Sequence, residues 1–257
     1  MGGTEARHRA DGYRASHLEK GDEYDAAIES AAFDAYLACV ERDLLLRLVP
    51  RLFPTGVERY LDFACGTGRI TAVVAQFARE SIGVDVSASM VARAREKCPA
   101  TKFVMRDITV DPIGLQAFDL VTAFRFFGNA EPELRYSALR AIGELLAPGG
   151  YLVLNNHRNA ASTHNRLLRL RKRSDGADLT LPMLTELLRA SGFEVVSVIA
   201  IGAWLLRYRW CRRSILESSW AHRLERLSRL PGVAGLSPDM IVVARRQESR
   251  GAVRDDR

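Results

Sequence analysis

A glycine-rich turn near residue 66 is the first segment whose residue types could do chemistry. In YLDFACGTGRI (60–70), Gly66 and Gly68 allow the backbone to turn tightly and to approach a ligand that a Cβ atom would exclude. The helix expected after the turn begins with N–H groups that suit a polar or anionic ligand. This pattern describes any nucleotide-binding turn. A dinucleotide-binding GxGxxG turn would need glycine at position 71, where the chain has Thr71.

Two acidic side chains follow the next two expected strands. Asp85, in GVDVSASM, lies opposite the glycine turn, where a carboxylate can accept both hydroxyls of a ribose. Ser87 can already cap the helix that follows, so Asp85 is not needed as a cap. Asp107 could accept a hydrogen bond from an exocyclic adenine amine, while Ile108 offers an apolar face to the ring. Asp107 could equally be a loop residue at a strand end, and the residues alone leave both interpretations open.

Five segments in order resemble the motif series of the class I S-adenosylmethionine (SAM) dependent methyltransferases. They are LDFACGTGRIT, GVDVSASMVARAREK, FVMRDI, FDLVTAFRFFGN and LLAPGGYLVL, and the resemblance covers 59–157 continuously. It implies SAM as the cofactor and S-adenosylhomocysteine as its product. It also implies an α/β, Rossmann-like fold with a helical cap, in which a doubly wound, mostly parallel sheet has seven strands. The final strand would be antiparallel and lie between the fifth and the sixth.

The resemblance also implies roles for individual residues. The implied cofactor-binding set is Asp62, Ala64, Gly66, Gly68, Asp85, Val86, Met90, Asp107, Ile108 and Phe124. In this set the two glycines face the methionine moiety, and Asp62 braces their turn. Asp85 holds the ribose, with Met90 beside the nucleoside, and the 107–108 pair frames the adenine. Residues 123–125 border the sulfonium and the access to the acceptor site.

Residues at the carboxyl ends of the fourth and fifth strands are the candidates for binding the methyl acceptor, because α/β ligands bind there. Methyl transfer needs an aligned acceptor and excluded water, and a base only where the acceptor must lose a proton. His157 is the candidate base, although it could be a loop histidine with local hydrogen bonds, and Arg125 is the second catalytic candidate. The acceptor-binding candidates are Tyr24, Phe126, Phe127, Asn129, Asn156 and Arg158.

Some of these candidates have a second interpretation, and some enzyme classes are disfavoured. Phe126 and Phe127 could equally be core side chains, and Tyr13 and Tyr24 are assigned to a lid over SAM by position alone. The fourth strand ends in FRFFGN, whereas enzymes that methylate base amino groups have (D/N)PP(Y/F). No group of Asp and Asn residues follows that strand, so we expect no metal of the magnesium-dependent catechol type.

Strands and helices alternate at lengths typical of parallel βαβ units. The expected strands are 59–64, 81–86, 102–106, 118–125, 151–156, 193–201 and 238–246. The expected helices are 24–48, 69–79, 88–97, 131–146, one that ends at Gly192 and a largely helical 203–230, with a turn at 147–150. We expect one domain over 21–246 with an N-terminal helical lid and basic insertions at 158–180 and 203–236. Residues 1–20 are expected to be disordered and 247–257 to be a solvated tail.

The composition is that of an ordinary globular protein, with 257 residues, 47% hydrophobic and 26% charged. The four cysteines are scattered, which favours reduced thiols, and no signal sequence or run of about 18 apolar residues is present. We therefore expect a cytoplasmic protein without an integral membrane span. The net charge of +6 is concentrated between residues 158 and 213, which hold eleven basic and four acidic residues.

The basic segments RLLRLRKR (166–173) and RYRWCRR (207–213) leave several interpretations open. They could bind an anionic acceptor, a membrane surface or RNA, or form an ordinary solvated face. We expect methyl transfer to an oxygen or nitrogen of a small metabolite, which includes anionic ones, such as a sugar, nucleotide-linked or secondary-metabolite acceptor. We expect a monomer or homodimer, and we do not expect nucleic acid as a partner. The alternatives are methylation of a lipid or macromolecule, and SAM binding without turnover.

Overall fold

The computed structural model describes residues 21–111, 114, 117–171, 178–202, 216, 219–227, 229–230 and 234–247. The expectations for residues 1–20, including Tyr13, lie outside the described residues. The same holds for the basic segment 207–213 and for the tail after residue 247.

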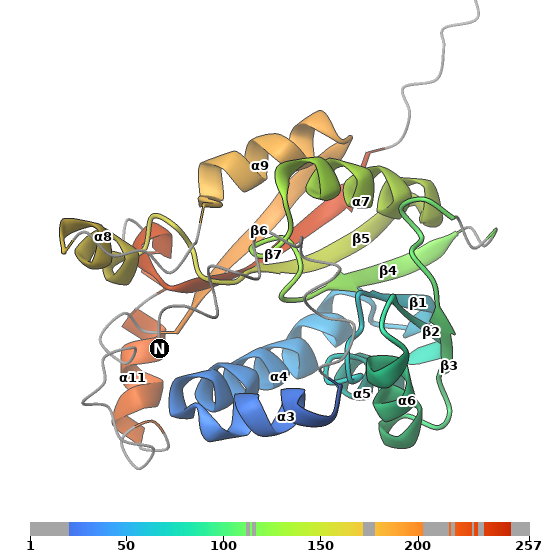
Figure 1. Ribbon diagram of the computed structural model, residues 1–257. Helices are drawn as coiled ribbons and strands as arrows, with labels where there is room; N and C mark the ends of the chain where they lie inside the picture. Colours follow the sequence, from blue (N-terminus) through green and yellow to red (C-terminus); the bar gives the residue numbers. More distant parts are fainter. Residues whose placement is uncertain are drawn as a thin grey trace, which may run out of the picture.

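A seven-stranded sheet in the order β3-β2-β1-β4-β5-β7-β6 forms the centre of the fold (Figure 1). Its strands are β1 (Val57–Phe63), β2 (Ala78–Asp85), β3 (Lys102–Met105), β4 (Phe118–Ala123), β5 (Leu146–Asn156), β6 (Phe193–Ile201) and β7 (Asp239–Arg246). The first five strands pair in parallel, and β7 is antiparallel to both β5 and β6. The expected fold, with the final strand inserted between the fifth and the sixth, is confirmed.

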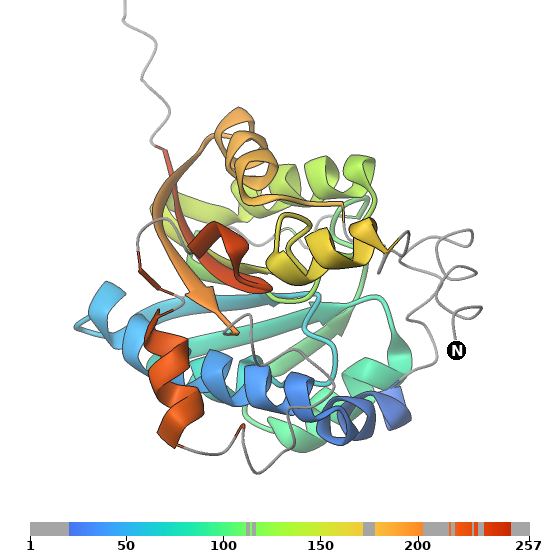
Figure 2. The same cartoon turned by 90° about the vertical axis from the view of Figure 1, so that its left-hand side faces the viewer.

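Helices cover both faces of this sheet. They are α3 (Gly21–Ser30), α4 (Ala32–Leu52), α5 (Thr71–Val74), α6 (Ala88–Lys97), α7 (Pro132–Leu145), α8 (Thr163–Leu170), α9 (Leu181–Ala190) and α11 (Ser219–Leu227), with short 3₁₀ helices η1 (Ala75–Phe77) and η3 (Ala234–Leu236). Helices α7 and α9 bury leucines such as Leu139 and Leu188 on one face. Helices α4 and α11 bury Leu45 and Ala221 on the other, and they lie side by side in both views (Figure 1, Figure 2).

Several expected element boundaries were wrong. The helix expected at 24–48 is two helices that meet at Ala31, and α4 continues through Pro50 to Leu52. The helix expected at 69–79 shortens to α5 and η1, because β2 begins at Ala78, which pairs with Val57 of β1. The pairing of the sheet therefore set this boundary, and helical propensity did not.

The connections around β5 also differ from the expectation. The turn expected at 147–150 is part of β5, which begins at Leu146 immediately after α7. The residues that favoured a turn are accommodated within β5 by a register shift against β4 and by the left-handed backbone of Gly149 (φ 76°). The basic segment after residue 158 contains α8, whose N-terminus is capped by the Ser162 hydroxyl. None of the described helices is long and apolar enough to cross a bilayer.

Candidate active site

An unusual backbone conformation occurs just after β1, β4 and β5, which are neighbours in the sheet. Ala64 (φ 53°), Arg125 (φ 56°) and Arg158 (φ 59°) follow these strands in the left-handed region. This conformation costs a non-glycine residue free energy, and such residues gather at functional sites. Within the described residues only one other non-glycine residue, Ala117, has a positive φ. The backbone alone therefore marks this edge of the sheet as the candidate site.

The two glycines of the turn after β1 are required for different reasons. A Cβ on Gly68 (φ 77°) would lie 3.2 Å from the Cα of Ala94, so this glycine lets the turn approach α6. A Cβ on Gly66 (φ 53°) would have no protein atom within 4 Å. Gly66 therefore has the left-handed backbone that favours glycine and an open face on which a ligand can lie, which fits a bound cofactor.

Asp85 ties this turn to the end of β2. Its Oδ2 accepts the Gly66 N–H at 2.8 Å and its Oδ1 accepts the Ser87 N–H at 2.9 Å. The Ser87 hydroxyl accepts the N–H of the buried Met90 at 3.4 Å, which confirms it as the cap of α6, and Val86 beside it is half-buried. Each carboxylate oxygen has two lone pairs, so an aspartate in this position can accept more than one hydrogen bond at each oxygen.

Asp62 lies beneath the turn and is fully buried. It accepts hydrogen bonds from the hydroxyls of Thr71 (2.6 Å) and Thr122 (2.8 Å), which join β1 to α5 and to β4. Burial raises the pKa of Asp62 to about 6, although the two hydroxyls oppose the shift. The expected brace is therefore present, and Thr71, where a dinucleotide-binding turn would have glycine, is one of its partners.

The residues expected around adenine contact their own loop or the hydrophobic core. The Oδ1 of Asp107 accepts the N–H and the hydroxyl of Thr109 at 3.0 and 2.6 Å, so Asp107 organises the loop after β3. Ile108 is buried in the core, as is Phe124 on the opposite face of the sheet. Contacts of these residues with the cofactor stay a prediction.

Helix α3 covers the glycine turn through contacts that the sequence did not suggest. The carboxylate of Asp25 accepts the hydroxyl of Thr67 at 2.6 Å and the ammonium of Lys97 at 2.7 Å. Its neighbour Tyr24 is half-buried. Asp25 thus holds α3 against the glycine turn, and a lid role for this helix stays a prediction.

Arg125, which follows β4, is surrounded by hydrogen-bond acceptors of the protein itself. Its N–H donates to Oδ1 of Asn155 at 2.5 Å, and its guanidinium lies 3.3 Å from the Asp34 carboxylate. Burial alone would lower the pKa of Arg125. The nearby carboxylates of Glu41, Asp34 and Asp239 raise this pKa above its ordinary value. Asn155 also donates to Glu41 at 2.9 Å. This buried arginine therefore stays charged in the acceptor region.

Two of these partners, Glu41 and Asn155, were not among the sequence candidates. Glu41 is buried on α4 and also forms an ion pair with Arg69, with an N–O distance of 2.8 Å. Helix α4 also has charged residues at Asp34, Arg42, Asp43, Arg47 and Arg51, so no signal in the sequence distinguished Glu41. For Asn155, the pair Asn155–Asn156 in a buried strand gave no indication of which side chain faces the site.

His157 pairs with a second residue that the sequence analysis missed. Its Nδ1 lies 3.0 Å from Oδ1 of the fully buried Asp239, and the Arg158 N–H donates to the same oxygen at 3.0 Å. Because a carboxylate only accepts, a neutral His157 has its proton on Nδ1 and keeps Nε2 as an acceptor. Asp239 begins β7, which pairs antiparallel with the end of β5. Its position in the expected strand order was the signal that could have found it.

Asn129 links the two arginines of the site. It donates to the carbonyl of Arg125 at 2.5 Å and accepts from the guanidinium of Arg158 at 2.5 Å. Gly128 beside it is required, because a Cβ there would collide with the carbonyl oxygen of His157. The structure thus brings Arg125, Asn129, His157 and Arg158 together, as expected from the sequence.

Three of the expected acceptor-binding residues are placed elsewhere. Phe126 is buried and packs edge to face on Phe63 and Phe127, with ring centroids 4.8 and 5.2 Å apart. Of the two interpretations left open for these phenylalanines, their position favours core side chains, because α7 packs over them. Asn156 is fully buried and donates to the carbonyl of Leu179 at 3.3 Å. This hydrogen bond connects the end of β5 to the segment that precedes α9.

Comparisons with known proteins agree with this geometry. A family model described as a methyltransferase domain matches residues 61–150. A methyltransferase of Geobacillus sp. (strain WCH70) is 31% identical over 148 residues, 55% of this chain and 57% of that protein. The trans-aconitate 2-methyltransferase of Paracidovorax citrulli is 31% identical over 128 residues, 48% of this chain and 47% of that protein. The chain thus spans about half the length of the curated relatives it matches.

A solved structure extends the likeness over more of the chain. Magnesium protoporphyrin IX methyltransferase from Synechocystis PCC 6803 has a TM-score of 0.62 and 14% identity, covering 91% of this chain and 97% of that chain. At this identity the likeness shows the fold alone.

Proposed function

Since this chain belongs to the class I SAM-dependent methyltransferase family, whose cofactor is SAM, we propose that it transfers a methyl group to an oxygen or nitrogen of a small, anionic metabolite. One observation carries the proposal. A cofactor-type turn and a histidine–carboxylate pair lie at the same edge of one sheet, after β1 and β5, the two strands that flank β4.

The cofactor side of the site consists of the turn and the carboxylate beside it. The open face of Gly66 and the carboxylate of Asp85 beside it would hold the methionine and ribose parts of SAM. When bound, SAM supplies a methyl group already activated by its sulfonium. The chain therefore needs no nucleophile of its own and has to bind, orient and exclude water.

The acceptor side supports loss of a proton from the acceptor. Nε2 of His157 can accept a hydroxyl proton, and the buried Asp239 holds the ring in place and stabilises the imidazolium that forms. This arrangement suits a hydroxyl or an ammonium acceptor, since either must lose a proton.

Two arginines support an anionic acceptor. Arg125 and Arg158 follow neighbouring strands and are connected through Asn129, and guanidinium groups bind carboxylates and phosphates with two parallel hydrogen bonds. One relative is named for trans-aconitate, a carboxylate acceptor, which agrees with this choice. We also propose that the enzyme works in the cytoplasm as a monomer or homodimer, which rests on the sequence alone.

Methyl-labelled SAM tests the proposal. We would incubate the purified protein with it and with a fractionated lysate of the source organism, and follow the label into small molecules, lipid, protein and nucleic acid. We expect label in small molecules that an anion-exchange column retains. Label in lipid or nucleic acid would show that the acceptor class is wrong. Absence of label in every fraction, with SAM binding intact, would favour a SAM-binding protein without turnover.

A further inference from the structure

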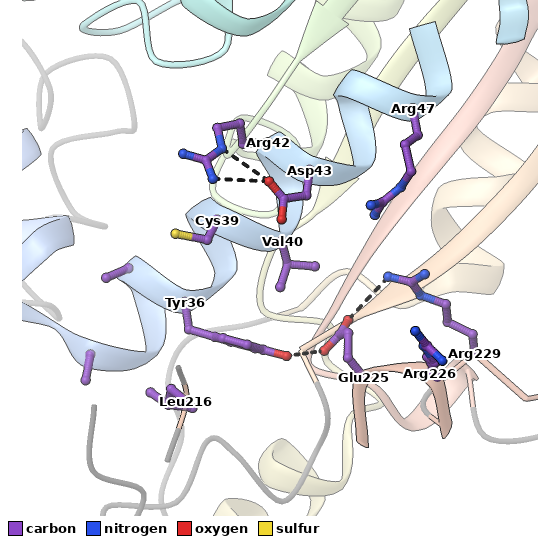
Figure 3. A pocket seen from close by; sticks show the side chains of 12 residues that line it. Tyr36, Cys39, Val40, Arg42, Asp43, Arg47, Leu216, Glu225, Arg226 and Arg229 are labelled. Carbon is purple, nitrogen blue, oxygen red and sulfur yellow. Dashed lines mark hydrogen bonds and ion pairs between the residues drawn. The ribbon is translucent and has the colours of Figure 1, made fainter. Parts of the chain in front are cut away.

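A pocket of about 440 Å³ lies between α4 and α11 (Figure 3). Its apolar part is formed by Ala32, Ala35, Val40 and Leu216, together with the ring of Tyr36. Four arginines and two acidic residues also line it, namely Arg42, Arg47, Arg226, Arg229, Asp43 and Glu225. This volume lies within the range of pockets that bind small molecules, about 300–1,000 Å³.

The pocket and the candidate active site lie on opposite faces of α4. Asp34 and Glu41 are seven residues apart, so they share the face that contacts Arg125 and Asn155. Asp43 comes two residues after Glu41, about 200° around the helix axis. The helix itself therefore separates this pocket from the methyl-transfer site.

Hydrogen bonds hold the walls of the pocket together without a ligand. The buried Glu225 of α11 accepts the hydroxyl of Tyr36 at 2.7 Å and the N–H of Gly202 at 3.0 and 3.1 Å. Burial, followed by the charge of Glu225, raises the pKa of Tyr36 above its ordinary value, so the phenol remains a donor. These bonds connect α11 with α4 and with the end of β6. The space between the helices is consequently preformed.

The charged side chains that line the pocket have a net positive charge. Glu225 is engaged by Tyr36 and Gly202, and Asp43 is paired with Arg42 at 3.2 Å. Arg229 is 3.9 Å from Glu225 and retains 35% of its side-chain exposure. Figure 3 shows the guanidinium groups of Arg47 and Arg229 directed toward the same part of the pocket. Both carboxylates are thus partnered, and the arginines exceed them by two.

We propose that this pocket binds a small organic anion. Arg47, Arg226 and Arg229 would hold its carboxylate or phosphate, and its apolar part would lie on Val40 and the Tyr36 ring. Arginine suits this role because its planar fork binds either group with two hydrogen bonds. The ligand is distinct from the methyl acceptor, because it lies on the other face of α4.

Calorimetric titration of the full chain with octanoate and with octyl phosphate tests the proposal. We expect saturable binding of at least one of them at a single site, and much weaker binding of octanol and of inorganic phosphate. In an Arg47→Gln, Arg226→Gln double variant the affinity should fall about tenfold or more, since each lost charge-assisted hydrogen bond contributes to binding. Arg51→Gln is the matched control, because Arg51 is an exposed arginine of α4 outside the pocket.

Cys39 provides a second readout that needs no enzymatic turnover. It is an exposed thiol that lines the pocket. Bound octanoate should slow its alkylation by iodoacetamide, followed by mass spectrometry of the peptide that contains it, in the parent protein and not in the double variant.

Four results would overturn the proposal. Octanol binding as tightly as octanoate would show a purely apolar pocket, and inorganic phosphate binding as tightly as octyl phosphate would show a plain anion site. Equal affinity in parent and double variant would show that the arginines do not bind the anion. Absence of saturable binding to either anion, with binding only to phosphatidylglycerol vesicles, would assign the arginines to a membrane surface. None of these measurements depends on methyl transfer.

Discussion

The turn after β1 and the loops after β4 and β5 lie at the same edge of one sheet, but different contacts hold them. The cofactor turn is fixed largely by nearby backbone, since Asp85 accepts N–H groups from Gly66 and Ser87, 19 and 2 positions away. The acceptor region depends on side chains that meet across the chain. Asp239 is 82 positions from His157, and Glu41 is 114 positions from Asn155.

Because of this difference, mutations in the two regions should have different effects. Changes in the turn should alter the affinity for SAM, because the turn presents backbone and one carboxylate to the cofactor. Changes at the ends of β5 and β7 should alter turnover and leave that affinity intact. The following experiments test this separation through turnover, SAM affinity or the stability of the fold.

The largest effect is expected for His157→Ala. Loss of the base should reduce turnover with the true acceptor by about 10²–10⁴-fold, the usual contribution of general acid–base catalysis. Affinity for SAM, measured by calorimetry, should not change. An unaltered turnover number would remove His157 as the base.

The next largest effect is expected for Asp85→Ala. Loss of charge-assisted hydrogen bonds should weaken SAM binding by about 1.5–3 kcal/mol. Asp111→Ala is a suitable control, because Asp111 is an exposed aspartate paired with Arg106 after β3. If the Asp85 variant bound SAM as tightly as the parent, the ribose site would lie elsewhere.

Asp239→Asn should reduce turnover by no more than loss of the histidine, because the ring remains but loses the carboxylate that orients it and stabilises its charged form. The two changes should not be additive, since Asp239 acts through His157. A double variant of both residues should therefore be no slower than His157→Ala alone. Additive losses would mean that Asp239 acts independently, for example by fixing the Arg158 backbone.

Asp62 connects β1 to α5 and to β4, and it provides a pH-dependent test. Its folded pKa of about 6 lies above the ordinary 3.8, so the folded state binds more protons and the contribution of Asp62 to stability declines as pH rises from about 4 to 6. The Asp62→Asn variant lacks this decline. Relative to the parent, its free energy of unfolding in urea should rise by about 1–2 kcal/mol between pH 4 and pH 7. A constant difference would contradict the raised pKa.

The smallest effect is expected for Thr67→Val, which removes the bond to Asp25. SAM affinity should fall by about 0.5–1.5 kcal/mol, because α3 is then held less firmly over the turn. Thr109→Val, which removes a hydroxyl bonded to Asp107, is the comparison on the adenine side. If Thr67→Val leaves affinity unchanged, α3 does not contribute to the cofactor site.

The same contrast explains which features could be predicted from the sequence. The glycine turn, the Ser87 cap and the Asp85 position are local patterns of residue type and spacing. The strand order came from the family resemblance. Asp25, Glu41 and Asp239 could not be predicted in this way, because each meets its partner only after distant elements pack. For Phe126 and Phe127, apolar character alone could not distinguish a pocket wall from a core covered by α7.

The insertion of β7 between β5 and β6 has a consequence for synthesis of the protein. Among the described strands, β6 pairs only with β7, and Asp239 is the first residue of β7. A growing chain can therefore assemble β1 to β5 and the cofactor turn while β6 has no neighbour and His157 has no carboxylate. A product that stops before residue 239 would have the cofactor turn and an incomplete acceptor site. We therefore expect translation to complete the proposed cofactor site first and the proposed acceptor site last.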